Sequence, residues 1–219
     1  MIILTDLSEV LIRGLYGVDG IIASRFGQET AKLYNNRRSE VGEQLQNLFR
    51  GKMTESGFWH IFFESCELPF GCDEMMNFFS ENLKHIIPGT LEVFRDVVAF
   101  PDSFDSPQKT TGCPDIYVVS DHVKERINEV RHLHPEVFNI MSGTFWSCDF
   151  GSIKRDGDFL THVLNSVSIR PEEAVFIDDS EANIIAAQRE FSGRLQTIQF
   201  QNADALKCKL IELGFEFRD

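Results

Sequence analysis

The sequence predicts an α/β fold in which a parallel sheet, surrounded by helices, carries one all-helical insertion. Apolar runs rich in Val and Ile occur at residues 2–4, 116–119 and 174–177, and such runs indicate buried strands. Segments with helical periodicity alternate with the later runs, and strands that alternate with helices form parallel sheets. Residues 14–87, after the first run, are helical in pattern and show no strand alternation.

The elements follow from these patterns in chain order. The strand at 2–4 ends at Asp6, and the helical segment 14–87 follows it. A helix begins near Pro88-Gly89-Thr90, and the polar, Pro-rich residues 101–114 are expected to form a loop. The remaining predicted elements are a strand at 116–119, a helix at 123–133, a short strand at 137–141, a helix at 158–167, a strand at 174–177, a helix at 180–190, a strand at 195–200 and a helix at 203–213.

This order predicts two domains. Residues 1–13 and 88–219 would form a Rossmann-like α/β core domain, and residues 14–87 would form a helical cap domain inserted after the first strand. A chain of 219 residues is long enough for one core with one modest insertion.

Composition excludes several classes of function. Asp and Glu total 34 against 21 Lys and Arg, a net charge of -13, which disfavours binding to nucleic acid and to anionic membranes. No signal peptide and no membrane-spanning segment is predicted. The five Cys form no CxxC pair, so we expect neither a disulfide framework nor a structural zinc site. A cytoplasmic protein, monomer or homodimer, is the expectation.

Polar residues that can carry chemistry follow the predicted strands. Asp6 follows the first strand, Ser120 and Asp121 the second, and Asp178-Asp179 a later one, while Lys154 lies in a loop. Each alone is a common turn former, helix cap or solvated side chain. Together they fit phosphoryl transfer, because a carboxylate can attack phosphorus, a hydroxyl and an ammonium can hold phosphoryl oxygens, and carboxylates from two loops can bind Mg²⁺.

The order and spacing of these residues resemble the haloacid dehalogenase superfamily, in particular members with a small helical cap. The resemblance covers nearly the whole chain and is most specific over residues 169–183. It implies that Asp6 is the nucleophile and a Mg²⁺ ligand, that Ser120 and Asp121 contact the substrate, and that Lys154 orients the nucleophile. Asp178 and Asp179 would complete the Mg²⁺ site, and Asn183 would support it. The implied activity is a magnesium-dependent phosphatase acting on a small phosphorylated metabolite through an aspartyl-phosphate.

Ser8 departs from the family pattern. Phosphatases of this family carry a second Asp two positions after the nucleophile, which protonates the leaving group and activates water. A Ser hydroxyl does not ionise near neutral pH, although the Ser8 carbonyl can still bind Mg²⁺. Glu9 is a weak substitute, because on an extended segment its side chain would point away.

Several alternatives stay open from the sequence. The chain could be a slow phosphatase, a phosphotransferase or dehalogenase-like relative, or a ligand- or partner-binding module. His122 could face the site and act on a leaving group, and Arg37, Arg38 and Arg50 of the predicted cap could meet an anionic substrate. His132 and His134 lack an evident third ligand, so a metal site there is not expected.

Overall fold

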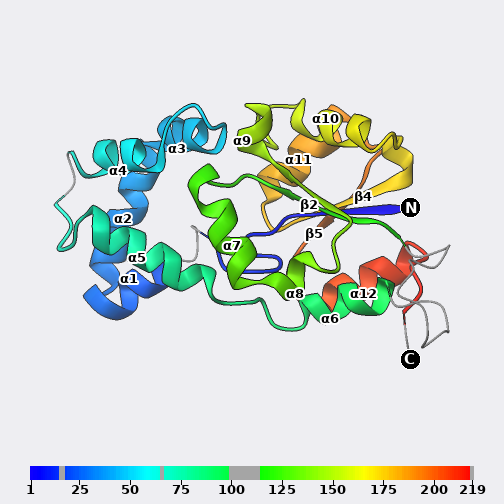
Figure 1. The fold of residues 1–219 in the computed structure, drawn as a ribbon, viewed down its shortest axis with the longest axis horizontal. Helices are drawn as coiled ribbons and strands as arrows, with labels where there is room; N and C mark the ends of the chain where they lie inside the picture. Colours follow the sequence, from blue (N-terminus) through cyan, green and yellow to red (C-terminus); the bar gives the residue numbers. More distant parts are fainter. Residues whose placement is uncertain (15–17, 65–66, 99–113, 218–219) are drawn as a thin grey trace.

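The computed structural model describes residues 1–14, 18–64, 67–98 and 114–217. Its centre is a five-stranded sheet in the order β3-β2-β1-β4-β5, and every neighbouring pair of strands is parallel (Figure 1). The strands are β1 (Ile2–Thr5), β2 (Ile116–Ser120), β3 (Gly143–Trp146), β4 (Ala174–Asp178) and β5 (Gln196–Gln199). The predicted α/β class with a Rossmann-like parallel sheet is therefore confirmed.

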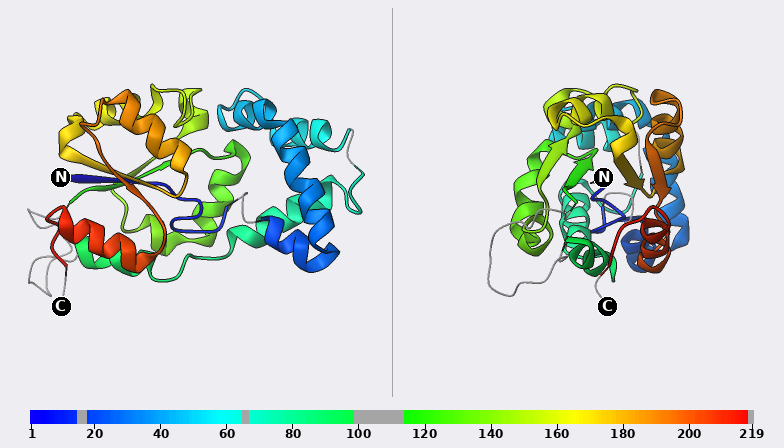
Figure 2. Two further views of the ribbon diagram at one scale, coloured as in Figure 1. Left: turned by 180° about the vertical axis from the view of Figure 1, so that it is seen from behind. Right: turned by 90° about the vertical axis from the view of Figure 1, so that its right-hand side faces the viewer.

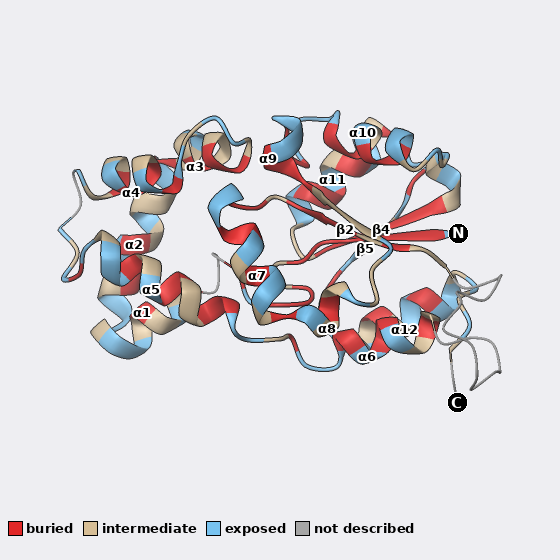
Figure 3. Ribbon diagram, in the orientation of Figure 1, coloured by how far each residue is buried: buried red, intermediate tan, exposed pale blue. Residues whose placement is uncertain are grey.

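The three central strands β1, β2 and β4 are mostly apolar and buried, because helices cover both faces of the sheet (Figure 3). Ile2 and Leu4 pack on one side with α10 (Phe159–Ser166) and α11 (Glu181–Glu190). Ile3 packs on the other side with α6 (Thr90–Val98), α7 (Ile127–Leu133) and α12 (Ala203–Glu212). Side chains alternate between faces along a strand, so this short run contributes to two separate apolar clusters.

Five helices form what we call the helical block, which lies beyond the carboxyl ends of the strands (Figures 1 and 2). They are α1 (Val18–Phe26), α2 (Gln28–Glu40), α3 (Gly42–Phe49), α4 (Glu55–Phe63) and α5 (Cys72–Leu83). The chain enters and leaves the block side by side, since Ile12 and Ile86 form an antiparallel bridge. The helical character predicted for 14–87 is thus confirmed where the structure describes it. That this segment is a separate cap domain stays a prediction.

One predicted strand is wrong. Residues 137–141 do not form a strand; α8 (Pro135–Phe138) occupies the first part, and β3 follows at Gly143–Trp146. Pro135 is at the first helical position, where its fixed φ favours a helix and its missing N–H costs nothing. A short helix α9 (Ser147–Phe150), not predicted, comes directly after β3. The loop predicted at 101–114 lies outside the described residues except for Pro114.

The helical block is joined to the core by a buried ion pair. Both oxygens of Glu55 accept hydrogen bonds from Arg126 at 2.8–3.0 Å, and the two side chains are 5% and 9% exposed. Arg126 also donates to Ser80 and Glu129, both at 2.7 Å. The guanidinium therefore has a partner on the core and partners on two helices of the block.

No helix in the described part of the chain has the length and apolar character needed to cross a bilayer. The cytoplasmic location stays a prediction.

Replacing Arg126 tests the weight of this buried pair. We expect Arg126→Met to lower the free energy of unfolding by about 3–5 kcal/mol, because the Glu55 carboxylate would stay buried without its partner. Urea denaturation measures the loss. Arg25→Met is the matched control, since Arg25 pairs with Glu81 at the surface and should contribute less than about 1 kcal/mol. Equal losses of unfolding free energy in the two variants would contradict the conclusion that the buried Arg126–Glu55 pair stabilises the contact between the block and the core.

Candidate active site at the carboxyl edge of the sheet

Three neighbouring strands bring the candidate residues to one edge. In the register of the sheet, Thr5 of β1 lies beside Val118 of β2 and Ile177 of β4. Asp6 is the next residue after β1, and its backbone N–H donates to the Ile177 carbonyl at 2.8 Å. Asp178 is the last residue of β4. Residues 113 or more positions apart in the chain therefore meet because parallel strands end at the same edge.

Asp6, Asp178 and Asp179 form a cluster of carboxylates. Each offers one oxygen, and these oxygens lie within 4.8 Å of one another. Backbone amides orient two of them: the Leu7 N–H donates to Asp6 at 2.6 Å, and the Ser180 N–H donates to Asp178 at 2.9 Å. A hard cation such as Mg²⁺ prefers oxygen donors of this kind, so the donor set fits the predicted metal.

Lys154 is the cation at the centre of the cluster. Its Nζ lies 2.8 Å from Asp6 Oδ2 and 2.6 Å from Asp178 Oδ2, and the residue is only 1% exposed. Burial opposes its charge, but the attraction of Asp178, Asp6 and Asp121 outweighs burial and holds the pKa of Lys154 above its ordinary value. One ammonium faces several acids, so the cluster has room for a further positive charge.

The pKa values of two carboxyl groups in the cluster are raised above their ordinary range. Burial, followed by repulsion from Asp178 and Asp179, raises the pKa of Asp6 to about 8, although Lys154 pulls it down. Burial and Asp178 raise the pKa of Asp179 to about 6. The protonated forms of Asp6 and Asp179 therefore persist to a higher pH than usual. A bound metal ion would displace these protons.

Asn183 and Arg155 hold the cluster from outside. Asn183 Nδ2 donates to both oxygens of Asp178, at 3.0 and 3.1 Å, and Arg155 Nε donates to Asn183 Oδ1 at 3.0 Å. The structure thus places Asn183 against a carboxylate of the cluster, where sequence reasoning expected support for a metal site. Arg155 was missed, although its place next to Lys154 was a usable signal.

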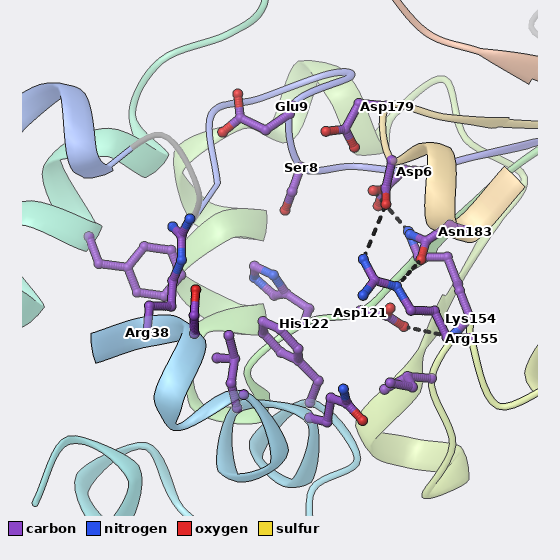
Figure 4. A pocket seen from close by; sticks show the side chains of 18 residues that line it. Asp6, Ser8, Glu9, Arg38, Asp121, His122, Lys154, Arg155, Asp179 and Asn183 are labelled. Carbon is purple, nitrogen blue, oxygen red and sulfur yellow. Dashed lines mark hydrogen bonds and ion pairs between the residues drawn. The ribbon is translucent and has the colours of Figure 1, made fainter. Parts of the chain in front are cut away.

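Ser8 and Glu9 both line the cavity (Figure 4). Glu9 is in the left-handed region, at φ 59°, so the extended segment assumed for it is wrong. Its carboxylate is nonetheless engaged elsewhere, because it accepts hydrogen bonds from Arg13 and from the Gly14 N–H, both at 2.8 Å. Ser8 packs against Gly14 so closely that a Cβ on Gly14 would lie 2.6 Å from the Ser8 Cβ.

The residues at the carboxyl end of β2 differ in their contacts with the cavity. Ser120 is fully buried, and its Oγ has no hydrogen-bond partner among the residues described. Asp121 lines the cavity, and its carboxylate accepts the Lys154 backbone N–H at 3.1 Å. Burial raises the pKa of Asp121 to about 6. His122 also lines the cavity; burial and then Arg126 lower its pKa to about 4, so its ring is neutral.

A cavity of about 500 Å³ lies between the carboxylate cluster and the helical block (Figure 4). The block contributes Arg38, Leu45, Gln46, Phe49 and Phe79, among others. This volume falls in the range of about 300–1,000 Å³ found for small-molecule sites.

The three Arg singled out from the sequence have different places. Arg38 lines the cavity and faces the carboxylates from across it (Figure 4). Arg37 donates to the carbonyls of Phe62 and Ile61, so it belongs to the packing of the block. Arg50 pairs with Asp156 of the core. Within the described residues, His132 and His134 belong to no metal-binding cluster.

Solved structures share this fold. A haloacid dehalogenase family enzyme from Bacteroides thetaiotaomicron has a TM-score of 0.61 at 17% identity, over 92% of this chain and 93% of that one. It was also solved with magnesium and inorganic phosphate, in a form with a TM-score of 0.58 at 16% identity, over 91% and 93%. An L-2-haloacid dehalogenase from Xanthobacter autotrophicus reaches 0.62 at 9% identity, over 99% and 85%. The fold is that of haloacid dehalogenase-type hydrolases.

Curated relatives match a shorter stretch. A chloroplast flavin mononucleotide hydrolase from Arabidopsis thaliana is 36% identical over 74 residues, which are 34% of this chain and 29% of that protein. A sesquiterpene phosphatase from Aspergillus oryzae is 32% identical over 73 residues, 33% of this chain and 37% of that protein. The chain therefore matches about a third of the length of these relatives. No protein-family model matches it.

Metal binding to the cluster should depend on pH. Because the pKa values of Asp6 and Asp179 are raised in the folded state, the cluster contributes stability at low pH, and this is lost as pH rises through about 6 and then about 8. Mg²⁺ should restore it, so the increase in melting temperature on adding Mg²⁺ should be larger at about pH 8.5 than at about pH 5. Differential scanning fluorimetry measures the melting temperature with and without Mg²⁺ at each pH. The increase should be lost in Asp179→Asn; an equal increase in that variant would place the metal elsewhere.

Proposed function

We propose that this chain, which has the fold of haloacid dehalogenase-type hydrolases, is a magnesium-dependent phosphatase that acts on a small phosphorylated metabolite through an aspartyl-phosphate on Asp6. The observation that carries the proposal is the contact of Lys154 Nζ with both Asp6 and Asp178 at the wall of a cavity. An ion pair alone could be structural, but this one lies next to a third carboxylate, Asp179, and lines a cavity large enough for a substrate.

The first half of the reaction begins at Asp6. One carboxylate oxygen forms a bond to phosphorus while the bond from phosphorus to the leaving oxygen breaks, and the leaving oxygen departs with the electron pair and takes a proton from solvent. Lys154 Nζ, at 2.8 Å from Asp6 Oδ2, holds the carboxyl group in place and lowers its pKa against the effect of burial. Mg²⁺ held by Asp6, Asp178, Asp179 and the Ser8 carbonyl would neutralise phosphoryl charge and orient the phosphate.

The second half releases phosphate. A water oxygen attacks the phosphorus, the bond to the Asp6 oxygen breaks, and Asp6 regains its carboxylate while the attacking water gives up a proton to solvent. Ser120 and Asp121 are the substrate contacts that the family pattern supports. Ser120 is the weaker of the two, since the hydroxyl is buried. No carboxylate at position 8 takes part in either proton transfer, so we propose a slow enzyme.

The helical block is proposed to act as a cap that covers the leaving group. Its contribution to the cavity wall combines apolar Leu45, Phe49 and Phe79 with polar Gln46 and Arg38. Apolar walls with a few polar groups suit a substrate with an apolar or aromatic body. We therefore propose phosphomonoesters of such alcohols, with a hydrogen-bond acceptor facing Arg38, rather than small sugar phosphates.

Hydrolysis of an aryl phosphate tests this function. With Mg²⁺ present we expect weak release of phosphate, faster for naphthyl phosphate than for glucose phosphates, and none above background for Asp6→Asn, because an amide is a poor nucleophile. A phosphate-release assay measures the rates. Asp204→Asn, at an exposed position, is the matched control. No turnover by the wild-type chain across a broad phosphate panel, with Mg²⁺ bound, would refute the phosphatase proposal.

Restoring a carboxylate at position 8 tests the missing acid and base. General acid–base help contributes about 10²–10⁴-fold in rate, so Ser8→Asp should raise kcat by at least about tenfold even if its placement is imperfect. Ser8→Asn has nearly the same shape without the proton-carrying group and should show no increase. If both variants behave alike, the limitation lies in the shape of the cavity and not in proton transfer.

A further inference from the structure

We propose that Arg50 is a positioning residue that couples docking of the helical block to the placement of Lys154, acting through Asp156. The inference rests on the proposed function, since Lys154 is the group that Arg50 would position. It assigns a role to an Arg that the sequence singled out only as a candidate for substrate binding.

Arg50 directly follows α3 and reaches out of the block to the core. Its Nε donates to Asp156 Oδ2 at 2.7 Å, and a terminal guanidinium nitrogen contacts the other oxygen, Oδ1. The side chains are 16% and 27% exposed, so water screens this pair only in part. The hydrogen bond from Arg50 holds the pKa of Asp156 below its ordinary value, which keeps the carboxylate ionised. A two-point contact of this kind fixes direction as well as distance.

Asp156 closes the turn that carries Lys154. The same Oδ2 that Arg50 contacts accepts the Ile153 backbone N–H at 3.1 Å, and the Asp156 N–H donates to the Ile153 carbonyl at 2.9 Å. Lys154 lies inside this turn, and its own N–H is held by Asp121 at 3.1 Å. Arg50 therefore anchors the carboxylate that determines how the Lys154 backbone is presented to Asp6.

A second contact from the same end of α3 reaches the loop after β2. Ser147 Oγ donates to the Phe49 carbonyl at 2.6 Å and accepts the His122 N–H at 3.2 Å. Gly51 lies against the core, since a Cβ there would be 2.8 Å from the Cys148 carbonyl oxygen. The last turn of α3 and the residues after it thus contact the core at two places, the start of α9 and the turn that carries Lys154.

The consequence for catalysis is geometric. Lys154 is packed between Asp6 and Asp178, and misplacement of a catalytic group by about 1 Å can cost about 10²-fold in rate. The Arg50–Asp156 contact, formed with the block docked on the core, fixes the turn that carries Lys154. Loss of Arg50 should reduce the rate of the chemical step more than it reduces substrate binding.

The experiment compares Arg50→Met, Asp156→Asn and the double variant by steady-state kinetics on an aryl phosphate with saturating Mg²⁺. We expect each single variant to lower kcat by about tenfold or more with KM changed less than about threefold, and the double variant to be no worse than the poorer single one. Asn at 156 can still accept the Ile153 N–H, so that variant isolates the contact with Arg50. Arg50→Lys should recover only part of kcat. The Lys ammonium keeps the positive charge, but it cannot reproduce the two-point contact of the guanidinium.

Arg25→Met is the control for loss of an Arg from the block, and its kcat should match the wild type. All rates are measured well below each variant's melting temperature. Unchanged kcat in Arg50→Met, fully additive losses in the double variant, or a rise in KM alone would each overturn the inference while leaving the phosphatase proposal intact. Absence of turnover in the wild type would refute the proposed function itself. In that case Mg²⁺ binding is compared between Arg50→Met and the wild type. Equal binding would show that the carboxylate cluster is assembled without the Arg50–Asp156 contact, and it would also overturn the inference.

Discussion

The contact of the Lys154 ammonium with Asp6 and Asp178 is the interaction on which the rest of the site depends. Buried carboxylates repel one another, and without Lys154 the edge of the sheet would hold two uncompensated charges next to β1 and β4. The fold makes this arrangement possible because β1 and β4 are parallel neighbours, and the segment between α9 and α10 brings Lys154 to both carboxylates. The same arrangement leaves an excess of negative charge, which suits a divalent cation.

Ser8 defines what is unusual about this chain. Asp6, Lys154, Asp178 and Asp179, to which the proposed function gives the aspartyl-phosphate and its metal, lie together, whereas the position proposed to speed proton transfer carries a hydroxyl. In the proposed function, the hydroxyl at position 8 slows both proton transfers, and an aryl phosphate, whose leaving group needs little protonation, suffers mainly in the hydrolysis of the intermediate. The half-buried Glu9 carboxylate does not replace the missing Asp, since Arg13 and the Gly14 N–H hold it.

The parts of the structure that sequence predicted are those set by local pattern. The apolar runs of β1, β2 and β4 located Asp6, Ser120 and Asp178, because a buried strand shows in its own residues. The strand predicted at 137–141 failed, since Pro135 favours a helix and the edge strand β3 has little apolar signal. Arg50 and Asp156 lie 106 positions apart, and no local pattern indicates which partner a charged side chain will meet.

The most direct test of the central claim is to find the phosphoryl group on Asp6. Wild-type chain mixed with aryl phosphate and Mg²⁺ is quenched in acid, treated with borohydride to reduce any acyl phosphate, and mapped by peptide mass spectrometry. The account expects residue 6 to be converted to homoserine in the wild type, more so than in Ser8→Asp, and not at all in Asp6→Asn. Turnover without modification of Asp6, or modification of another carboxylate, would contradict it.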